Sequence, residues 1–204
     1  MVKIILVMLA SYLAGSIPFG LLITKLFKGV DVRNYGSGNT GATNVYRVLG
    51  LGGGLLALIL DAGKGALAVK LAQSVLGSNP FLFLLAGLFA VAGHNVSIFL
   101  KFDGGRGVAT SVGVLSSLAP VPMLVTFIVW LIIVIISQYV SLGSIVGAVI
   151  LPVLMIFFNI DLAIVIFTVL MAAFVIYSHK PNIKRLLAGT ENKVELKLTP
   201  DQED

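Results

Sequence analysis

Six long hydrophobic stretches are the feature that most limits how this chain can fold. They cover about residues 4–24, 52–76, 80–100, 108–137, 141–158 and 160–178. Each is near or above the roughly 18 apolar residues that cross a bilayer as one helix. Only 11% of the 204 residues are charged, against roughly 25% in soluble domains. The sequence therefore predicts an all-α, polytopic integral membrane helical bundle and excludes a soluble fold.

The first stretch is interpreted as a retained span. It is longer than the apolar region of a usual signal peptide, and no clear small-residue cleavage pattern follows it. The chain has no cysteine, which excludes disulfides, thiolate catalysis and cysteine-based metal sites. Two histidines alone make a poor zinc site, so no metal is expected.

The basic residues predict the orientation of the spans. Most of the 14 Lys and Arg residues lie in three polar segments, whereas the turns near 77–79, 119–122 and 159–161 have none. The basic residues of the three segments are Lys25, Lys28, Arg33 and Arg47; Lys101 and Arg106; and Lys180, Lys184, Arg185, Lys193 and Lys197. Because cytoplasmic loops are enriched in Lys and Arg, all three segments are expected on the cytoplasmic side.

The number of crossings depends on the stretch 108–137, which is long for one helix and contains Pro120 and Pro122. We expect it to split there into a short half-span and a full span. The bundle then has about seven spans, some short or broken, with the N-terminus outside and the C-terminus cytoplasmic. A single kinked helix over 108–137, together with one later re-entrant or fused segment, would give five spans. One catalytic domain is expected over 1–188, followed by a polar cytoplasmic tail over 189–204.

Two glycine-rich segments favour phosphate binding. The first, "NYGSGNTGATNVYR" (34–47), combines flexible glycines with hydroxyl and amide groups and ends in an arginine that fits phosphate oxygens. Its candidate residues are Gly36, Ser37, Gly38, Asn39, Thr43, Asn44 and Arg47. The second, "FDGGRGVATSVG" (102–113), is a glycine turn that opens a helix, which is typical of an anion site. Its candidate residues are Gly104, Gly105, Arg106, Gly107 and Thr110.

Both segments also have simpler interpretations as a connector and a tight turn. The second lacks the spacing of a nucleotide-binding P-loop. In a third segment, "YSHKPNIKRLLAGTE" (177–191), we expect His179, Asn182, Lys184 and Arg185 to lie at the level of the lipid headgroups. The simpler interpretation is that basic residues after a last span only mark the cytoplasmic side and attract anionic lipid.

Five further polar residues within or beside the spans complete the candidates. Ser141 or Ser144 falls at a turn that the seven-span arrangement places inside. Asp61 and Lys64 share one helix face, where they are interpreted as a structural pair. His94 is interpreted as a hydrogen-bonded structural residue.

Three phosphate-binding segments on one membrane face indicate either a transported anion or an enzyme acting on phosphorylated, partly lipid-soluble substrates. The motif of serine hydrolases, G-x-S-x-G, is absent. The H-x-x-x-x-D pattern of other acyltransferases is also absent, because Phe99 follows His94 at that spacing and Lys184 follows His179. An activated donor such as an acyl phosphate needs fewer catalytic residues, because its leaving group is phosphate. Binding, alignment and exclusion of water then suffice for the transfer.

The motifs "GSGNTGATNVYR", "FDGGRGVATSVG" and "SHKPNIKRLLAGTE", in this order, resemble those of the bacterial membrane acyl-phosphate:glycerol-3-phosphate acyltransferase family. "GSIPFG" (15–20) and "DAGKG" (61–65) are similar to that family too. The resemblance implies transfer of a fatty acyl group from acyl phosphate to the 1-hydroxyl of glycerol-3-phosphate, giving lysophosphatidic acid and phosphate in phospholipid synthesis. It implies no cofactor, no metal and no acyl-CoA.

The resemblance also implies roles for individual residues. Ser37 and Arg47 match an essential serine and arginine, and the glycines at 104, 105 and 107 match a phosphate-binding loop. Ser144, His179 and Asn182 match polar positions of the site, and Glu191 matches a structural glutamate. Where the family usually has lysine this chain has Arg106, whose planar fork binds phosphate differently, although activity is expected to persist.

The expected partners are glycerol-3-phosphate, acyl phosphate and membrane lipid, with no nucleic acid and no metal. We expect a monomer in the bacterial plasma or inner membrane, multi-pass, with its active site on the cytoplasmic face. An anion or phosphate transporter is the alternative function, and a lipid-binding scaffold without turnover is a third.

Overall fold

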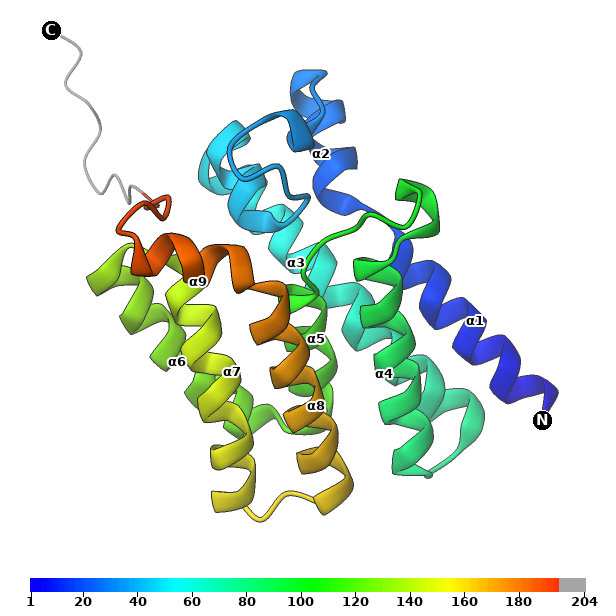
Figure 1. Cartoon of the computed structure of the whole chain (residues 1–204). Helices are drawn as coiled ribbons and strands as arrows, with labels where there is room; N and C mark the ends of the chain where they lie inside the picture. Colours follow the sequence, from blue (N-terminus) through cyan, green and yellow to red (C-terminus); the bar gives the residue numbers. More distant parts are fainter. Residues whose placement is uncertain (195–204) are drawn as a thin grey trace, which may run out of the picture.

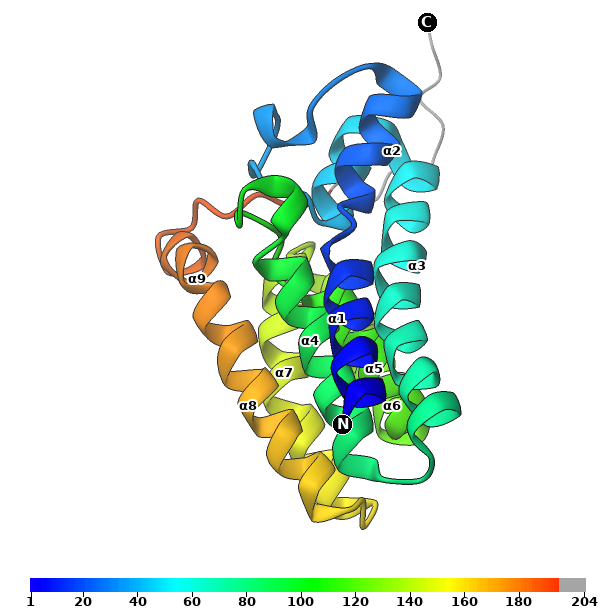
Figure 2. The same ribbon diagram turned by 90° about the vertical axis from the view of Figure 1, so that its right-hand side faces the viewer.

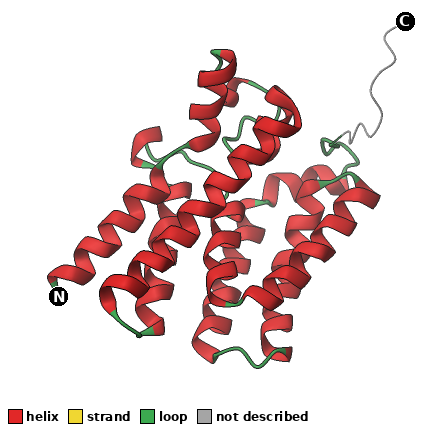
Figure 3. Cartoon of the chain, turned by 180° about the vertical axis from the view of Figure 1, so that it is seen from behind, coloured by secondary structure: helices red, strands yellow, loops and turns green. Residues whose placement is uncertain are grey.

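The structure, a computed structural model, describes residues 1–194 and consists of helices and loops, with no strand in this range (Figures 1 and 3). The helices are α1 (Val2–Ser16), α2 (Phe19–Lys28), η1 (Val32–Asn34), α3 (Ala42–Leu76), α4 (Pro80–Asn95), η2 (Ile98–Leu100), α5 (Val108–Leu118), α6 (Pro120–Ser137), α7 (Val140–Phe157), α8 (Leu162–Ser178) and α9 (Lys180–Leu187). The all-α prediction is confirmed.

Proline sets two of the helix boundaries. The long stretch 108–137 is divided at Ala119, and Pro120 is the first residue of α6, a position where its missing N–H costs nothing. The predicted split is therefore confirmed. The first hydrophobic stretch is also divided, because Ile17 is extended and Pro18 precedes α2.

Within residues 1–194, five segments are long and apolar enough to span a membrane, or six if the bent pair α8 and α9 is one span. The pair α1 and α2 counts as one of the five, and α5, with 11 residues, falls short of the required length. By this criterion the bundle is a polytopic membrane fold. The count of seven crossings and the orientation of the termini stay predictions.

The polar segments gather at one end of the bundle. Figure 1 shows α2, the loop between α4 and α5, and α9 at the upper end, whereas the turns after α3 and α7 lie at the opposite end. Figure 2 shows the same separation from the side. Segments that are far apart in the sequence therefore meet where the basic residues are concentrated.

Small residues bring α3 and α5 into close contact. A Cβ atom on Gly65 of α3 would overlap the carbonyl oxygen of Thr110, and one on Gly113 of α5 would overlap that of Ala62. Such close approach is how helices associate in lipid, where the hydrophobic effect does not drive them together. The contact fixes the beginning of α5 beside the middle of α3.

A buried ion pair joins α3 to the break between α1 and α2. Lys64 Nζ lies 2.8 Å from Asp61 Oδ1, and the two side chains are 3% and 2% exposed. Lys64 also donates a hydrogen bond of 2.8 Å to the carbonyl oxygen of Ile17. That oxygen lies at the break, so the lysine neutralises the carboxylate and donates a hydrogen bond to the chain where the helix is interrupted.

Removing one partner of this pair is expected to destabilise the protein. Lys64→Met leaves the Asp61 carboxylate buried without its cation, which costs about 3–5 kcal/mol when a buried pair is broken. The double variant Asp61→Asn/Lys64→Met leaves no uncompensated charge and is expected to lose much less. The measurement is the thermal unfolding midpoint in detergent, and equal midpoints for wild type and Lys64→Met would contradict a structural role.

Candidate functional site

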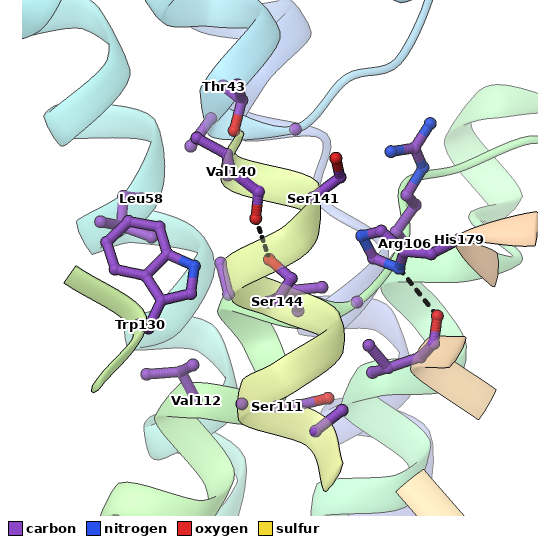
Figure 4. A pocket seen from close by; sticks show the side chains of 18 of the residues that line it. Thr43, Leu58, Arg106, Ser111, Val112, Trp130, Val140, Ser141, Ser144 and His179 are labelled. Atoms are coloured by element: carbon purple, nitrogen blue, oxygen red, sulfur yellow. Dashed lines mark hydrogen bonds between the residues drawn. The ribbon is translucent and has the colours of Figure 1, made fainter. Parts of the chain in front are cut away.

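A cavity of about 400 Å³ extends from the loops at the basic end into the bundle. It is lined by the loop before α3 and by α3, α5, α6, α7, α8 and α9, together with the residues that follow α9 (Figure 4). Each of the three motifs contributes to its wall. We call the polar end of the cavity the mouth, defined by Ser37, Arg47, Arg106, Ser141, His179, Asn182, Arg185 and Glu191.

The first motif is folded around the side chain of Asn44. Its amide nitrogen donates to the carbonyl oxygens of Val32, Tyr35 and Asn39 at 2.8–2.9 Å, and its oxygen accepts from the Ser37 N–H at 3.0 Å. Asn44 is 1% exposed. The amide is therefore committed to holding the loop in shape, and it places Ser37 at the cavity wall.

The second motif forms a turn that rests on the end of α4. The N–H groups of Gly104 and Gly105 donate to the carbonyl oxygens of Asn95 and His94, both at 3.0 Å. A Cβ atom on Gly105 would overlap the His94 ring. Gly107 has a φ of 75° and caps α5, a conformation that glycine adopts at no steric cost. These contacts hold Arg106 at the mouth.

The third motif is organised by Glu191. Its carboxylate accepts hydrogen bonds from Ser141 Oγ at 2.8 Å, Asn182 Nδ2 at 2.6 Å and Arg185 Nε at 2.7 Å. The Glu191 side chain is 5% exposed. This carboxylate joins α7, α9 and the segment after α9. The helix α9 is itself bent by 57° from α8.

His179 lies at that bend and has a defined tautomer. Its Nδ1 is 2.7 Å from the carbonyl oxygen of Val175 (Figure 4). Because a carbonyl oxygen only accepts, Nδ1 must carry the proton. The neutral ring then has its unprotonated nitrogen, Nε2, available at the cavity, where Figure 4 shows His179 beside Arg106.

The mouth carries an excess of positive charge. Arg185 is paired with Glu191, whereas Arg47 and Arg106 have no carboxylate partner within residues 1–194. Burial lowers the pKa of Arg106, and the charge of Arg185 lowers it further; the charge of Glu191 acts in the opposite direction, and Arg47 makes the smallest contribution, which also lowers the pKa. Two guanidinium groups that repel each other in a partly buried place favour a bound anion.

Helix N-termini add to this positive potential. The helices α3, α5, α7 and α9 all begin at the mouth, and none of their N-caps, Gly41, Gly107, Tyr139 and His179, makes a side-chain capping hydrogen bond. The first N–H groups of a helix have no partner within it, and they carry the positive end of the helix dipole. Their convergence at the mouth favours the binding of an anion.

The structure brings most of the predicted site residues to one cavity. Those that line it are Ser37, Asn39, Thr43, Asn44, Arg47, Asp61, Arg106, Gly107, Ser144, His179, Asn182 and Glu191. Gly36, Gly38, Lys64, Gly104, Gly105, Thr110 and Lys184 do not line it. Lys184 is exposed on α9, and its neighbour Arg185 faces the cavity instead.

The expected tail also contributes. Residues 189–194 turn back along the bundle, where Glu191 reaches the mouth and the Val194 N–H donates to the carbonyl oxygen of Gln138 at 2.8 Å. These contacts cross the expected boundary between 188 and 189, and the division into a catalytic domain and a tail stays a prediction. The remainder of the expected tail, 195–204, lies outside the described residues.

The inner part of the cavity is apolar, and we call it the shaft. It is lined by Leu58, Ile59, Val112, Leu115, Met123, Phe127, Trp130, Leu151, Met171 and Val175, among others. Sequence reasoning missed these residues because every helix here is apolar on most sides. Within residues 1–194 no cluster of three or more His, Asp or Glu side chains could hold a metal ion, and independence from metal stays a prediction.

Comparisons with known proteins agree with this arrangement. A family model described as "Glycerol-3-phosphate acyltransferase" matches residues 5–189. The glycerol-3-phosphate acyltransferase 2 of Moorella thermoacetica is 51% identical over 190 residues, which are 93% of this chain and 97% of that protein. The glycerol-3-phosphate acyltransferase of Desulforamulus reducens is 46% identical over 195 residues, covering 96% and 97%.

Solved structures share the fold. The crystal structure of PlsY (YgiH), an integral membrane glycerol 3-phosphate acyltransferase, in its glycerol 3-phosphate form has a TM-score of 0.88 and 39% identity, covering 94% of this chain and 95% of that chain. Its lysophosphatidic acid form has a TM-score of 0.86 and 38% identity, covering 93% and 94%.

The Glu191 contacts predict a pH dependence of stability. Burial alone would raise the pKa of Glu191, but hydrogen bonds from Asn182, Arg185 and Ser141 outweigh it and lower the pKa below its ordinary value of 4.5. A lowered pKa means that ionised Glu191 stabilises the folded state above that value, and that this stabilisation is lost as the pH falls through the folded-state pKa.

We expect the thermal unfolding midpoint of wild type to fall more steeply with pH below 4.5 than that of Glu191→Gln. Asp31, whose pKa the hydrogen bond from Arg33 lowers to about 2, titrates equally in both proteins and cancels in the comparison. Parallel curves for the two proteins would show that Glu191 makes no such contribution.

Proposed function

The chain belongs to the glycerol-3-phosphate acyltransferase family, and from this we propose that it transfers an acyl group from an acyl phosphate to the 1-hydroxyl of glycerol-3-phosphate. The products are lysophosphatidic acid and inorganic phosphate. The observation that carries the proposal is the cavity itself, in which a mouth rich in arginine continues directly into an apolar shaft. One cavity thus accepts a phosphorylated, water-soluble acceptor and a lipid-borne acyl chain.

The mouth supplies the phosphate-binding groups. Arg47 and Arg106 offer planar forks that bind phosphate oxygens with paired hydrogen bonds, and the four helix N-termini offer backbone N–H groups. Arg47 Nη2 makes one long hydrogen bond of 3.4 Å, to the carbonyl oxygen of Asn192. The remaining donors of the two arginines are available to the phosphates of acceptor and donor.

The shaft takes the acyl chain. Its lining is formed mainly by aliphatic and aromatic side chains of α5, α6, α7 and α8, which favour an alkyl chain over water in proportion to the apolar area covered. Leu58 and Ile59 of α3 also line the cavity, and Figure 4 shows Leu58 beside Trp130 of α6. With the phosphate at the mouth and the chain in the shaft, the reacting carbonyl lies between them.

Acyl transfer then needs alignment more than a strong base. The 1-hydroxyl oxygen of glycerol-3-phosphate attacks the carbonyl carbon, and the bond from that carbon to the phosphate oxygen breaks. The phosphate leaves with the electron pair and takes up the hydroxyl proton, so all atoms and charges balance. The donor's own phosphate removes the proton of the attacking hydroxyl, while the Nε2 of His179 accepts a hydrogen bond from the neighbouring 2-hydroxyl of glycerol-3-phosphate and so orients the acceptor.

Transport is a weaker explanation of the same residues. A phosphate pathway needs polar groups along its whole length, whereas the shaft is mainly apolar. A lipid-binding scaffold without turnover does not account for the arginine residues of the mouth. We place the active site on the cytoplasmic face of a bacterial membrane, because the mouth lies at the end where the basic residues gather, and we infer a monomeric enzyme that uses no metal or cofactor.

The donor is tested directly with purified protein and labelled glycerol-3-phosphate. Acyl phosphate is expected to give labelled lysophosphatidic acid, and acyl-CoA to give none, because the chain lacks the histidine and aspartate pattern of acyl-CoA-dependent enzymes. Product from acyl-CoA alone would overturn the choice of donor. No product from either donor would overturn the function.

Arg47 and Arg106 are expected to be essential. Arg47→Ala and Arg106→Ala each leave a phosphate without its charged partner, a loss of about 2–5 kcal/mol for a buried charge pair. We expect kcat/KM for glycerol-3-phosphate to fall by roughly two orders of magnitude. Arg106→Lys keeps the charge but loses the fork, and is expected to lie between wild type and Arg106→Ala.

Arg33→Ala is the matched control for these variants. Arg33 lies at the same end of the bundle, is paired with Asp31 at 2.7 Å and does not line the cavity. Its activity is expected to equal that of wild type. A similar loss in Arg33→Ala and Arg106→Ala would point to a general effect of surface charge and would remove Arg106 from the site.

A further inference from the structure

Ser111 carries a buried hydroxyl group that has no hydrogen-bond partner. Its side chain lines the cavity, the residue is 7% exposed, and its Oγ makes no hydrogen bond within the described protein. A buried polar group left unpaired costs about 1–3 kcal/mol. An unpaired hydroxyl in a cavity wall is therefore a place where a ligand supplies the missing partner.

Other buried hydroxyl groups along the cavity behave differently. Ser144, Thr126 and Thr168 each donate to the carbonyl oxygen four residues earlier in their own helix, at 2.9, 2.9 and 2.8 Å. For Ser111 that oxygen belongs to Gly107, and it accepts only the backbone N–H of Ser111, at 2.8 Å. The Ser111 hydroxyl thus keeps its donor unused, on a residue that lines the cavity.

Ser111 lies at the boundary between the mouth and the shaft. Along α5 it comes one turn after Gly107, which adjoins Arg106, and one turn before Leu115 of the shaft. One helical turn advances about 5–6 Å along the axis. Figure 4 shows Ser111 at the level of Val112, further into the bundle than Arg106 and His179. A group bound beside Ser111 is therefore too deep for the acceptor's phosphate and too shallow for the end of the acyl chain.

We propose that the Ser111 hydroxyl donates a hydrogen bond to the carbonyl oxygen of the acyl donor and stabilises the negative charge that develops on it during transfer. This role rests on the proposed function, because only the acyl carbonyl lies between a phosphate and an alkyl chain. As the glycerol hydroxyl attacks, the carbonyl electron pair moves onto oxygen and is returned when the phosphate leaves. Ser111 keeps its own proton throughout, so it is neither nucleophile nor base.

Ser111→Ala tests the role through a combination of effects that a structural serine does not produce. We expect kcat with acyl phosphate to fall by about 100-fold, the usual effect of removing one such donor, while KM for glycerol-3-phosphate stays unchanged. Because the variant removes an unpaired buried hydroxyl, its unfolding midpoint is expected to equal or exceed that of wild type. Ser111→Thr restores a hydroxyl and is expected to recover most of the activity.

Ser117→Ala serves as the matched control on the same helix. Ser117 Oγ donates to the carbonyl oxygen of Gly113 at 3.1 Å and lies outside the cavity lining, so its substitution is expected to leave kcat unchanged. Wild-type kcat in Ser111→Ala would overturn the role. So would a higher KM for glycerol-3-phosphate at unchanged kcat, or a loss of activity that follows a lowered midpoint. Absence of turnover in wild type would instead overturn the proposed function.

Discussion

A helix cannot satisfy its own first N–H groups, and the site depends on where this chain puts them. In a bilayer each helix buries its backbone polar groups internally except at its ends. Here α3, α5, α7 and α9 all begin at the mouth, without side-chain caps at Gly41, Gly107, Tyr139 and His179. The alternating direction of the helices thus collects unpaired donors in one place, and the close contact of α3 with α5 keeps them there.

The same arrangement explains why polar and apolar binding meet in one cavity. Helices that begin at the mouth continue inward as apolar walls, so the N–H groups at the helix ends adjoin the shaft directly. Arg47 and Arg106 reinforce the donors with full charges, whereas Arg185 is neutralised by Glu191. Ser111 lies at the transition, where backbone donors have ended and the first turn of α5 is complete. Each type of group therefore occurs at the depth that its chemistry requires.

Much of this was predictable from the sequence, because the decisive signals are local. The length of the hydrophobic stretches predicted the helical class, and Pro120 predicted the break between α5 and α6. The basic residues indicated that the three motifs lie at the same end of the bundle. The outcome at Lys184 and Arg185 was not predictable, because neighbouring residues on a helix point about 100° apart and the bend before α9 decides which one faces the cavity. The structural role of Asn44 was not predictable either, because its side chain bonds three carbonyl groups that lie 5 to 12 residues earlier in the chain. The shaft was hidden because lipid-facing and cavity-facing side chains are equally apolar.

The Glu191 carboxylate has a consequence for how the protein is made. A membrane chain is synthesised and inserted from its N-terminus, so α3 and α5 are in place well before residue 191. Until Glu191 arrives, Ser141 and Asn182 lack the acceptor that holds them, and the cationic charge of Arg185 stays unneutralised. The mouth therefore takes its final form only after residue 191 has been made, and a nascent chain halted after α8 lacks the carboxylate that holds Ser141, Asn182 and Arg185 together.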